Sequence, residues 1–352
     1  MPVLALSLGC LLLLLAPADP QAARVPAAGA ASELTDLAGL ARIGVPNGQR
    51  EIGTRPVRDA EPALFLVEAA AHSRQAFLLP GGPRTLRELV VEPTPATAEA
   101  WRTARLRLVW ESDDPDAGPG VDLPLGLLFG RFAPEAGLCA TLLADSWGPA
   151  WVCRFPMPYH ARALLDVATD RPLEGRIRLR TTAGVAPAAG YFRAASWSGP
   201  APFSDTGRGH LAGVLVVGER GRGSARSEAD ESRLVLDDRD RGPLAIALRL
   251  PGANGGEVTP SSAAATGRVQ AGHGGPSAAF RWLAADPLSY DRVMALRSAP
   301  GHDAVNRAGV GSGGESGGTA AVRVAVFWYS DRPRAGATSA TAVGSDPGQR
   351  GR

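Results

Sequence analysis

Two patterns in the chain contain residue types that bind phosphate or metal ions. Gly309, Gly311 and Gly314 match the GxGxxG pattern, whose backbone N–H groups hold a dinucleotide phosphate. Asp113–Asp116 is an acidic run of the kind found in calcium loops. The glycines do not follow a strand and open a helix, and the aspartates lack the spacing and the terminal glutamate of an EF-hand. Both patterns are therefore interpreted as loops.

Other common catalytic and binding patterns are missing from the sequence. The five histidines are scattered without metal-ligand spacing. Arg220, Arg222 and Arg226 form a basic cluster, but Glu219 and Glu228 lie close by, which favours a solvated loop. The formal net charge of +2 gives no argument for nucleic acid. We therefore predict no metal, no cofactor and no nucleic-acid partner.

The N-terminus is typical of an exported protein. Val3–Ala16 is an apolar run that is too short to span a bilayer but suits the core of a signal peptide. We predict a signal peptide over residues 1–23 and a periplasmic or extracellular location. No other stretch reaches membrane length, so we expect no membrane span. Cys139 and Cys153 then remain, and they are either paired in a disulfide or two buried thiols.

The elements that would position any functional residue are predicted to be short strands. Arg105–Trp110 alternates polar and apolar residues, as a half-buried strand does. Frequent Gly, Pro, Asp and Ser clusters separate such segments, which favours β-sandwiches or barrels. One short helix is expected at Ser32–Ala41. Further strands are expected at Leu64–Val67, Leu86–Val91, Arg176–Arg180, Leu211–Val217, Leu234–Leu236, Leu244–Leu250 and Val322–Tyr329.

Two segments resemble motifs of domain-of-unknown-function family 2961, now glycoside hydrolase family 172. Pro119–Gly130 (PGVDLPLGLLFG) resembles the family's P-S-V-E-V-P-L-G-D-F-F-G, and Trp151–Tyr159 (WVCRFPMPY) resembles its F-N-C-Y-W-P-M-P-F. Weaker similarities follow in the family's order at Leu34–Leu37, Pro80–Pro83, Gly207–Val214, Phe280–Leu288 and Val324–Tyr329. The resemblance thus covers roughly residues 34–330.

The resemblance implies an all-β protomer of two packed jelly-roll β-sandwiches, assembled as a homotrimer. We place the first roll at residues 59–200 and the second at 201–332, after a linker and N-terminal segment over 24–58. Residues 333–352 are predicted to be a disordered tail. The implied activity is retaining hydrolysis of α-fructofuranoside or D-arabinofuranoside linkages, with a carbohydrate as partner. Such a reaction needs two carboxylates about 5 Å apart across the anomeric carbon.

The two implied catalytic glutamates are matched unequally. Glu228 corresponds to the first, in a stretch that is similar in order to the family's E-G-D-x-x-I-x-V-D-G, with Ala229 at the central glycine. The second lies in G-T-G-T-E-D-Y-F, for which Glu257 is the nearest substitute. Leu127 also replaces an aspartate of the P-L-G-D-F-F-G segment. The alternative interpretation is therefore a catalytically inactive relative that serves as a glycan-binding or structural oligomer.

Overall fold

The computed structural model describes twelve ranges of the chain. These are residues 35–45, 53–56, 59–110, 119–132, 143–147, 149–198, 203–218, 232–243, 266–270, 277–283, 287–298 and 322–331. All of them belong to one compact unit, Thr35–Arg352. The predicted signal peptide, the predicted tail, the Gly309–Gly314 pattern, Asp113–Asp116 and the Arg220–Arg226 cluster lie outside the described residues.

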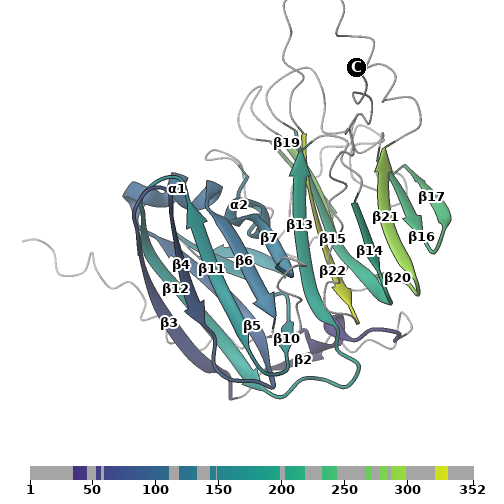
Figure 1. The fold of residues 1–352 in the computed structure, drawn as a ribbon, viewed down its shortest axis with the longest axis horizontal. Helices are drawn as coiled ribbons and strands as arrows, with labels where there is room; N and C mark the ends of the chain where they lie inside the picture. Colours follow the sequence, from purple (N-terminus) through teal and green to yellow (C-terminus); the bar gives the residue numbers. More distant parts are fainter. Residues whose placement is uncertain are drawn as a thin grey trace, which may run out of the picture. The chain divides into compact units, whose positions relative to one another are not determined.

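The first half of the chain is a sandwich of two antiparallel sheets (Figure 1). One sheet has the order β3 (Glu61–Ala69), β12 (Leu173–Ala183), β5 (Arg84–Pro93), β9 (Ala150–Cys153) and β8 (Ala144–Trp147), with β10 (Met157–Tyr159) also on β5. The facing strands are β4 (Ser73–Leu78), β11 (Ala163–Thr169), β6 (Arg105–Trp110) and β7 (Val121–Pro124). We number the strands along the chain from β3 to β12 and count β8, β9 and β10 as one position. The order is then 1-8-3-6 in one sheet and 2-7-4-5 in the other. That order is a jelly roll.

The second half repeats the same order. One sheet contains β13 (Tyr191–Ser198), β22 (Val322–Ser330), β15 (Gly209–Gly218), β19 (Ser277–Trp282) and β18 (Thr266–Gln270), with β20 (Leu288–Tyr290) paired to β15. The other contains β14 (Phe203–Thr206), β21 (Val293–Ser298), β16 (Ser232–Leu236) and β17 (Arg239–Pro243). With β18 and β19 as one position, the numbering is again 1-8-3-6 and 2-7-4-5. The predicted all-β fold of two jelly rolls is confirmed.

One sheet runs through both rolls. β13 pairs in parallel with β7 of the first roll, with Ala194 opposite Val121 and Ala195 opposite Asp122, and it pairs antiparallel with β22 of the second. These pairings join the β4 sheet of the first roll to the β15 sheet of the second, which makes ten strands in all. The predicted boundary between the rolls, between residues 200 and 201, lies outside the described residues and stays a prediction. By strand order β13, which precedes that boundary, is the first strand of the second roll.

Packing of β15 explains its apolar sequence. Every residue of this strand is buried. Val214 and Val216 face the core of the second roll, where they pack with Leu234 and Met294. Leu215, on the opposite face, belongs to the large core that includes the first roll. A strand covered on both faces needs a continuous apolar run rather than alternation, which is what the sequence has here.

The aromatic residues of the Trp151–Tyr159 segment lie in the core. Trp151, Phe155 and Tyr159 are all buried. The Phe155 ring lies 5.0 Å from that of Phe192 on β13 and 5.4 Å from that of Phe327 on β22, measured between centroids. Residues of the first roll thus pack directly on strands of the second.

Helical segments are few and short. They are η1 (Ala38–Ala41), η2 (Pro95–Thr97), α1 (Ala98–Thr103) and α2 (Leu125–Leu128), and β1 (Thr35–Asp36) pairs with β2 (Gly53–Pro56). No helix among the described residues has the length and apolar character needed to cross a membrane.

The prediction of a helix at Ser32–Ala41 is wrong for residues 35–41, which the structure describes. These residues form β1 and then a single 3-10 turn. The carbonyl of Leu40 is hydrogen-bonded to the buried ring of His210 at 2.8 Å, and that of Ala41 accepts from the N–H of Gly190. Tertiary partners therefore take carbonyl groups that a longer helix would use internally.

The predicted strands are confirmed wherever the structure describes them. Arg105–Trp110 is β6 with the same bounds, and its residues alternate between exposed or half-buried and buried. The other expected strands lie within β3, β5, β12, β15, β16 and β22. Leu244–Leu250 lies outside the described residues.

A glycine on β15 provides a test of this packing. A Cβ atom on Gly213 would meet the Trp282 ring more closely than real Cβ atoms approach their neighbours, whereas one on Gly81 would meet nothing. We expect Gly213→Ala to lower the free energy of unfolding by about 1–3 kcal/mol, the usual cost of overpacking. Gly81→Ala is the control and should change it by less than about 0.5 kcal/mol. Urea titration measures both, and an equal effect of the two changes would contradict this packing.

Candidate functional site

The two predicted catalytic glutamates lie outside the described residues. Glu228 falls between β15 and β16, and Glu257 between β17 and β18. The described strands on either side still show where these connections leave the second roll. β15 ends at Gly218, β16 begins at Ser232 and β17 ends at Pro243. Because β15 begins next to Arg208 and β16 and β17 are joined at the Asp237–Asp238 turn, these three positions lie at the end of the roll opposite those residues.

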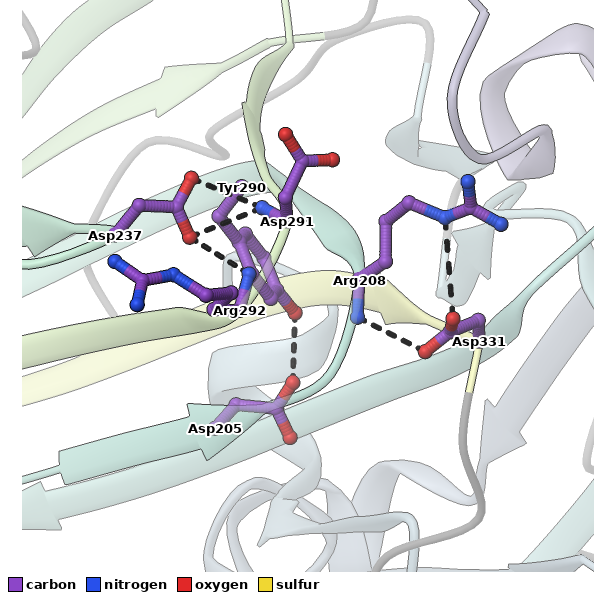
Figure 2. Close-up of polar contacts among 7 residues, drawn as sticks. All are labelled: Asp205, Arg208, Asp237, Tyr290, Asp291, Arg292 and Asp331. Atoms are coloured by element: carbon purple, nitrogen blue, oxygen red, sulfur yellow. Dashed lines mark hydrogen bonds and ion pairs between the residues drawn. The ribbon is translucent and has the colours of Figure 1, made fainter.

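Polar side chains gather at the other end of the second roll, around the β14–β15, β16–β17 and β20–β21 turns and the end of β22 (Figure 2). We call this the aspartate end. Its carboxylates come from the end of β14, the β16–β17 turn and the residue after β22: they are Asp205, Asp237 and Asp331. Three further residues supply most of their partners: Arg208, Tyr290 and Arg292. The described residues include no group of three or more His, Cys, Asp or Glu that could hold a metal ion.

The Asp205 carboxylate links the two sheets of the second roll. Its Oδ2 accepts a hydrogen bond of 2.6 Å from the hydroxyl of Tyr290, and the Tyr290 ring is buried. β14 and β20 belong to different sheets, so this bond joins them across the sandwich. Burial raises the pKa of Asp205, although the bond from Tyr290 and the charge of Arg193 oppose the shift. Burial and the neighbouring Asp205 together raise the pKa of Tyr290.

Gly209 leaves the space that Tyr290 needs. The two residues are directly opposite each other on β15 and β20. A Cβ atom on Gly209 would overlap both the Tyr290 hydroxyl and the carbonyl oxygen of Tyr329. Gly209 and His210 both lie in the Gly207–Val214 segment that resembles a family motif, and both have packing roles here.

Asp237 ties two hairpins together. Asp237 and Asp238 form the two-residue turn between β16 and β17, with φ values of 51° and 63°. Aspartate tolerates this left-handed conformation better than most residues do. The Asp237 carboxylate accepts hydrogen bonds from the backbone N–H groups of Asp291, Arg292 and Val293, at 3.0, 2.7 and 3.1 Å. Burial alone would raise the pKa of this carboxyl, but the three N–H groups outweigh it and lower the pKa.

Asp331 holds the start of β15 against the end of β22. One of its oxygens accepts a hydrogen bond of 2.9 Å from the N–H of Arg208, and the other lies 3.9 Å from the Nε of the same residue. The backbone N–H of Asp331 donates to the carbonyl of Arg208 in return. Each carboxylate at the aspartate end thus holds chain reversals in place, and we assign the cluster a structural role.

A second polar cluster lies on the outer face of the first roll. Glu88 on β5 is buried, with its carboxylate oxygens 3.5 Å from Arg154 Nε and 3.9 Å from Arg180 Nη1. Beside it, Glu92 is 2.6 Å from Arg178. Sequence reasoning did not single out these residues. The usable signal was Arg at alternate positions of β12, with Glu92 opposite Arg176 and Glu88 opposite Arg180 on β5.

Cys153 is a free, buried thiol, whereas Cys139 lies outside the described residues. Burial raises the pKa of the Cys153 thiol to about 12, so the reactive thiolate is rare near neutral pH. Leu127, at the position of a family aspartate, is buried and belongs to the large core.

Comparisons with known proteins give only distant similarity. No family model matches the chain. No curated protein matches it either. Among solved structures, the major capsid protein P2 of bacteriophage PM2 is 9% identical with a TM-score of 0.41, covering 78% of this chain and all of its own. The STIV MCP is 11% identical with a TM-score of 0.36, covering 77% of this chain and 97% of its own. We base no conclusion on these similarities.

The Asp205–Tyr290 pair predicts a pH dependence of stability. The folded protein holds a proton on Asp205 more tightly than the unfolded chain does, because its pKa is raised on folding. The resulting stabilisation is present below the ordinary carboxyl pKa and is lost as pH rises through the raised value. Asp205→Asn should therefore gain stability relative to the wild type between pH 4 and pH 7. Urea titrations across this range measure the difference, with the exposed Asp291→Asn as control. Parallel curves for wild type and Asp205→Asn would contradict the assignment.

Proposed function

We propose that the chain is a divergent relative of glycoside hydrolase family 172 that hydrolyses α-fructofuranoside or D-arabinofuranoside linkages with retention. Glu228 would be the nucleophile and Glu257 the acid/base. The proposal extends to an exported homotrimer with a carbohydrate partner. One observation carries the proposal. The strand termini next to the two glutamates, which are the end of β15 at Gly218, the start of β16 at Ser232 and the end of β17 at Pro243, lie at the same end of the second roll.

This placement suits the proposed chemistry. A retaining glycosidase needs two carboxylates about 5 Å apart. Residues in separate connections can meet only if those connections leave the scaffold close together, and connections on a rigid scaffold are where catalytic residues concentrate. At the aspartate end, in contrast, the carboxylates already bind backbone N–H groups, Tyr290 or Arg208.

The turn after β16 also supports the proposal. The family's first glutamate motif ends in D-G, which corresponds in order to Asp237 and Asp238. Asp238 has a φ of 63°, in the left-handed region that favours glycine. The backbone here therefore has a conformation that a glycine would provide. Asp237 lies one residue further from Glu228 than the family's spacing requires, so the turn supports the order of the motif and not its register.

The second candidate function is that of an inactive relative, either a glycan-binding protein or a structural oligomer. Leu127 favours it, because a core side chain occupies the position of a polar family residue. On this alternative the scaffold is retained and the catalytic residues are lost.

Turnover of aryl α-furanosides separates the two functions. For the enzyme, we expect Glu228→Gln to lower kcat/KM by about 10³-fold or more, because the reaction loses its nucleophile. Glu257→Gln should lower it by a smaller factor for substrates with good leaving groups. Product anomers followed by NMR should show retention. The matched control is Glu68→Gln, an exposed glutamate of the first roll, which should leave turnover unchanged.

Equal residual turnover in the wild type and Glu228→Gln would contradict the enzymatic proposal. Calorimetric binding of furanoside oligosaccharides by such a protein would then support the second candidate.

A further inference from the structure

The first roll exposes leucines on its two edge strands. Leu64 and Leu66 on β3 are 55% and 58% exposed, and Leu78 on β4 is 64% exposed. They are the exposed large apolar side chains within the described ranges. β3 and β4 each end the strand order of their sheet, so each has an edge with which none of the described strands pairs, called its free edge below. Exposed apolar residues on a free edge are what native proteins generally avoid unless the edge has a partner.

The free edge of β3 can be read from two hydrogen bonds to Gln75 of β4. Its Nε2 donates to the carbonyl of Leu66, and its Oε1 accepts from the N–H of Glu68, both at 3.3 Å. These backbone groups therefore point away from β12. Backbone direction alternates along a strand, so the N–H and C=O of Leu64 also point to the free edge.

Only weak contacts cover this edge. The two hydrogen bonds between the Gln75 side chain and β3 are at the long end of the normal range, and both are exposed to solvent. Pro62 is two residues before Leu64, so its backbone faces the same side, the free edge. A proline, which has no N–H, is tolerated there because no ladder bond to β12 is lost. A second strand could thus replace Gln75 without breaking any ladder bond to β12.

The apolar centre of β3 is symmetric about Phe65, since Ala63 and Leu64 precede it and Leu66 and Val67 follow it. This part of the strand is therefore complementary to itself. In an antiparallel pair with a two-fold axis at Phe65, Leu64 of one copy lies opposite Leu66 of the other. Ala63 lies opposite Val67, and the two carboxylates Glu61 and Glu68 lie opposite Ala69 and Pro62. In the centre of the pairing apolar residues therefore meet apolar residues, and at its ends each glutamate lies opposite an uncharged residue, so no like charges are directly opposed.

We propose that the free edge of β3 is an interface with a second copy of this chain. The copies pair antiparallel through Leu64 and Leu66 after Gln75 is displaced. This contact is isologous, with the same residues on both sides, and therefore gives two-fold symmetry. It is distinct from the three-fold association implied by the family resemblance, and it does not depend on the proposed activity.

Sedimentation velocity over a range of protein concentrations tests the interface. The wild type should self-associate, and Gln75→Ala should lower the dimer Kd about tenfold because it frees the Leu66 carbonyl and the Glu68 N–H. The double variant Leu64→Asp/Leu66→Asp should raise the Kd at least about a hundredfold, since it places four carboxylates in the contact. Leu78→Asp is the matched control, an equally exposed leucine on β4 whose change should alter the Kd less than twofold.

Hydrogen exchange distinguishes this contact from association through another surface. The amides of Leu64 and Leu66 should exchange at least tenfold more slowly at high than at low protein concentration. Self-association with unchanged exchange at these two amides would overturn the proposal. So would a monomeric Gln75→Ala variant, or association that persists in the double aspartate variant.

Discussion

The parallel pairing of β13 with β7 is the constraint on which the two-roll arrangement depends. β13 is the first strand of the second roll by topology, yet its other edge continues the sheet of the first. The pairing spans few residues, and packing reinforces it: the rings of Phe155, Phe192 and Phe327 meet beneath the junction. Because this sheet is shared, the orientation of β15 and β22 is tied to the strand order of the first roll.

Carboxylates in the second roll act mainly as ties between chain reversals. Each jelly-roll turn brings backbone N–H groups to the end of the sandwich, where no ladder partner is available. Asp237 accepts three of these groups, and Asp331 accepts one more. Asp205 instead spans the two sheets through Tyr290. The longer connections, 219–231 and 244–265, leave the strands at the opposite end of the roll.

The strands could be predicted from sequence because their signals are local. Arg105–Trp110 alternates cleanly and is β6, and the apolar run at Leu211–Val217, also predicted as a strand, lies within β15. The N-terminal helix was predicted wrongly because its residues are helix-compatible locally. The groups that override this preference, His210 and Gly190, come from distant parts of the chain. Such tertiary partners have no local signature.

The site was less predictable for a related reason. The positions that resemble family motifs are mostly glycine and apolar residues. Such residues meet packing requirements; Gly209, for example, leaves room for the side chain of Tyr290. They identify a scaffold and leave its chemistry open. The aspartate end was not anticipated, because Asp205, Asp237 and Asp331 are separated by long stretches of chain. Only the folded arrangement brings them together.

The shared sheet has a consequence for dissecting the protein. A fragment that stops before β13 would leave the far edge of β7 without a neighbour, and a fragment that begins at β13 would leave that strand's inner edge bare. Each would also strip one side of the ring cluster around Phe155. Although the chain contains two similar sandwiches, we therefore expect neither of them to fold without the other.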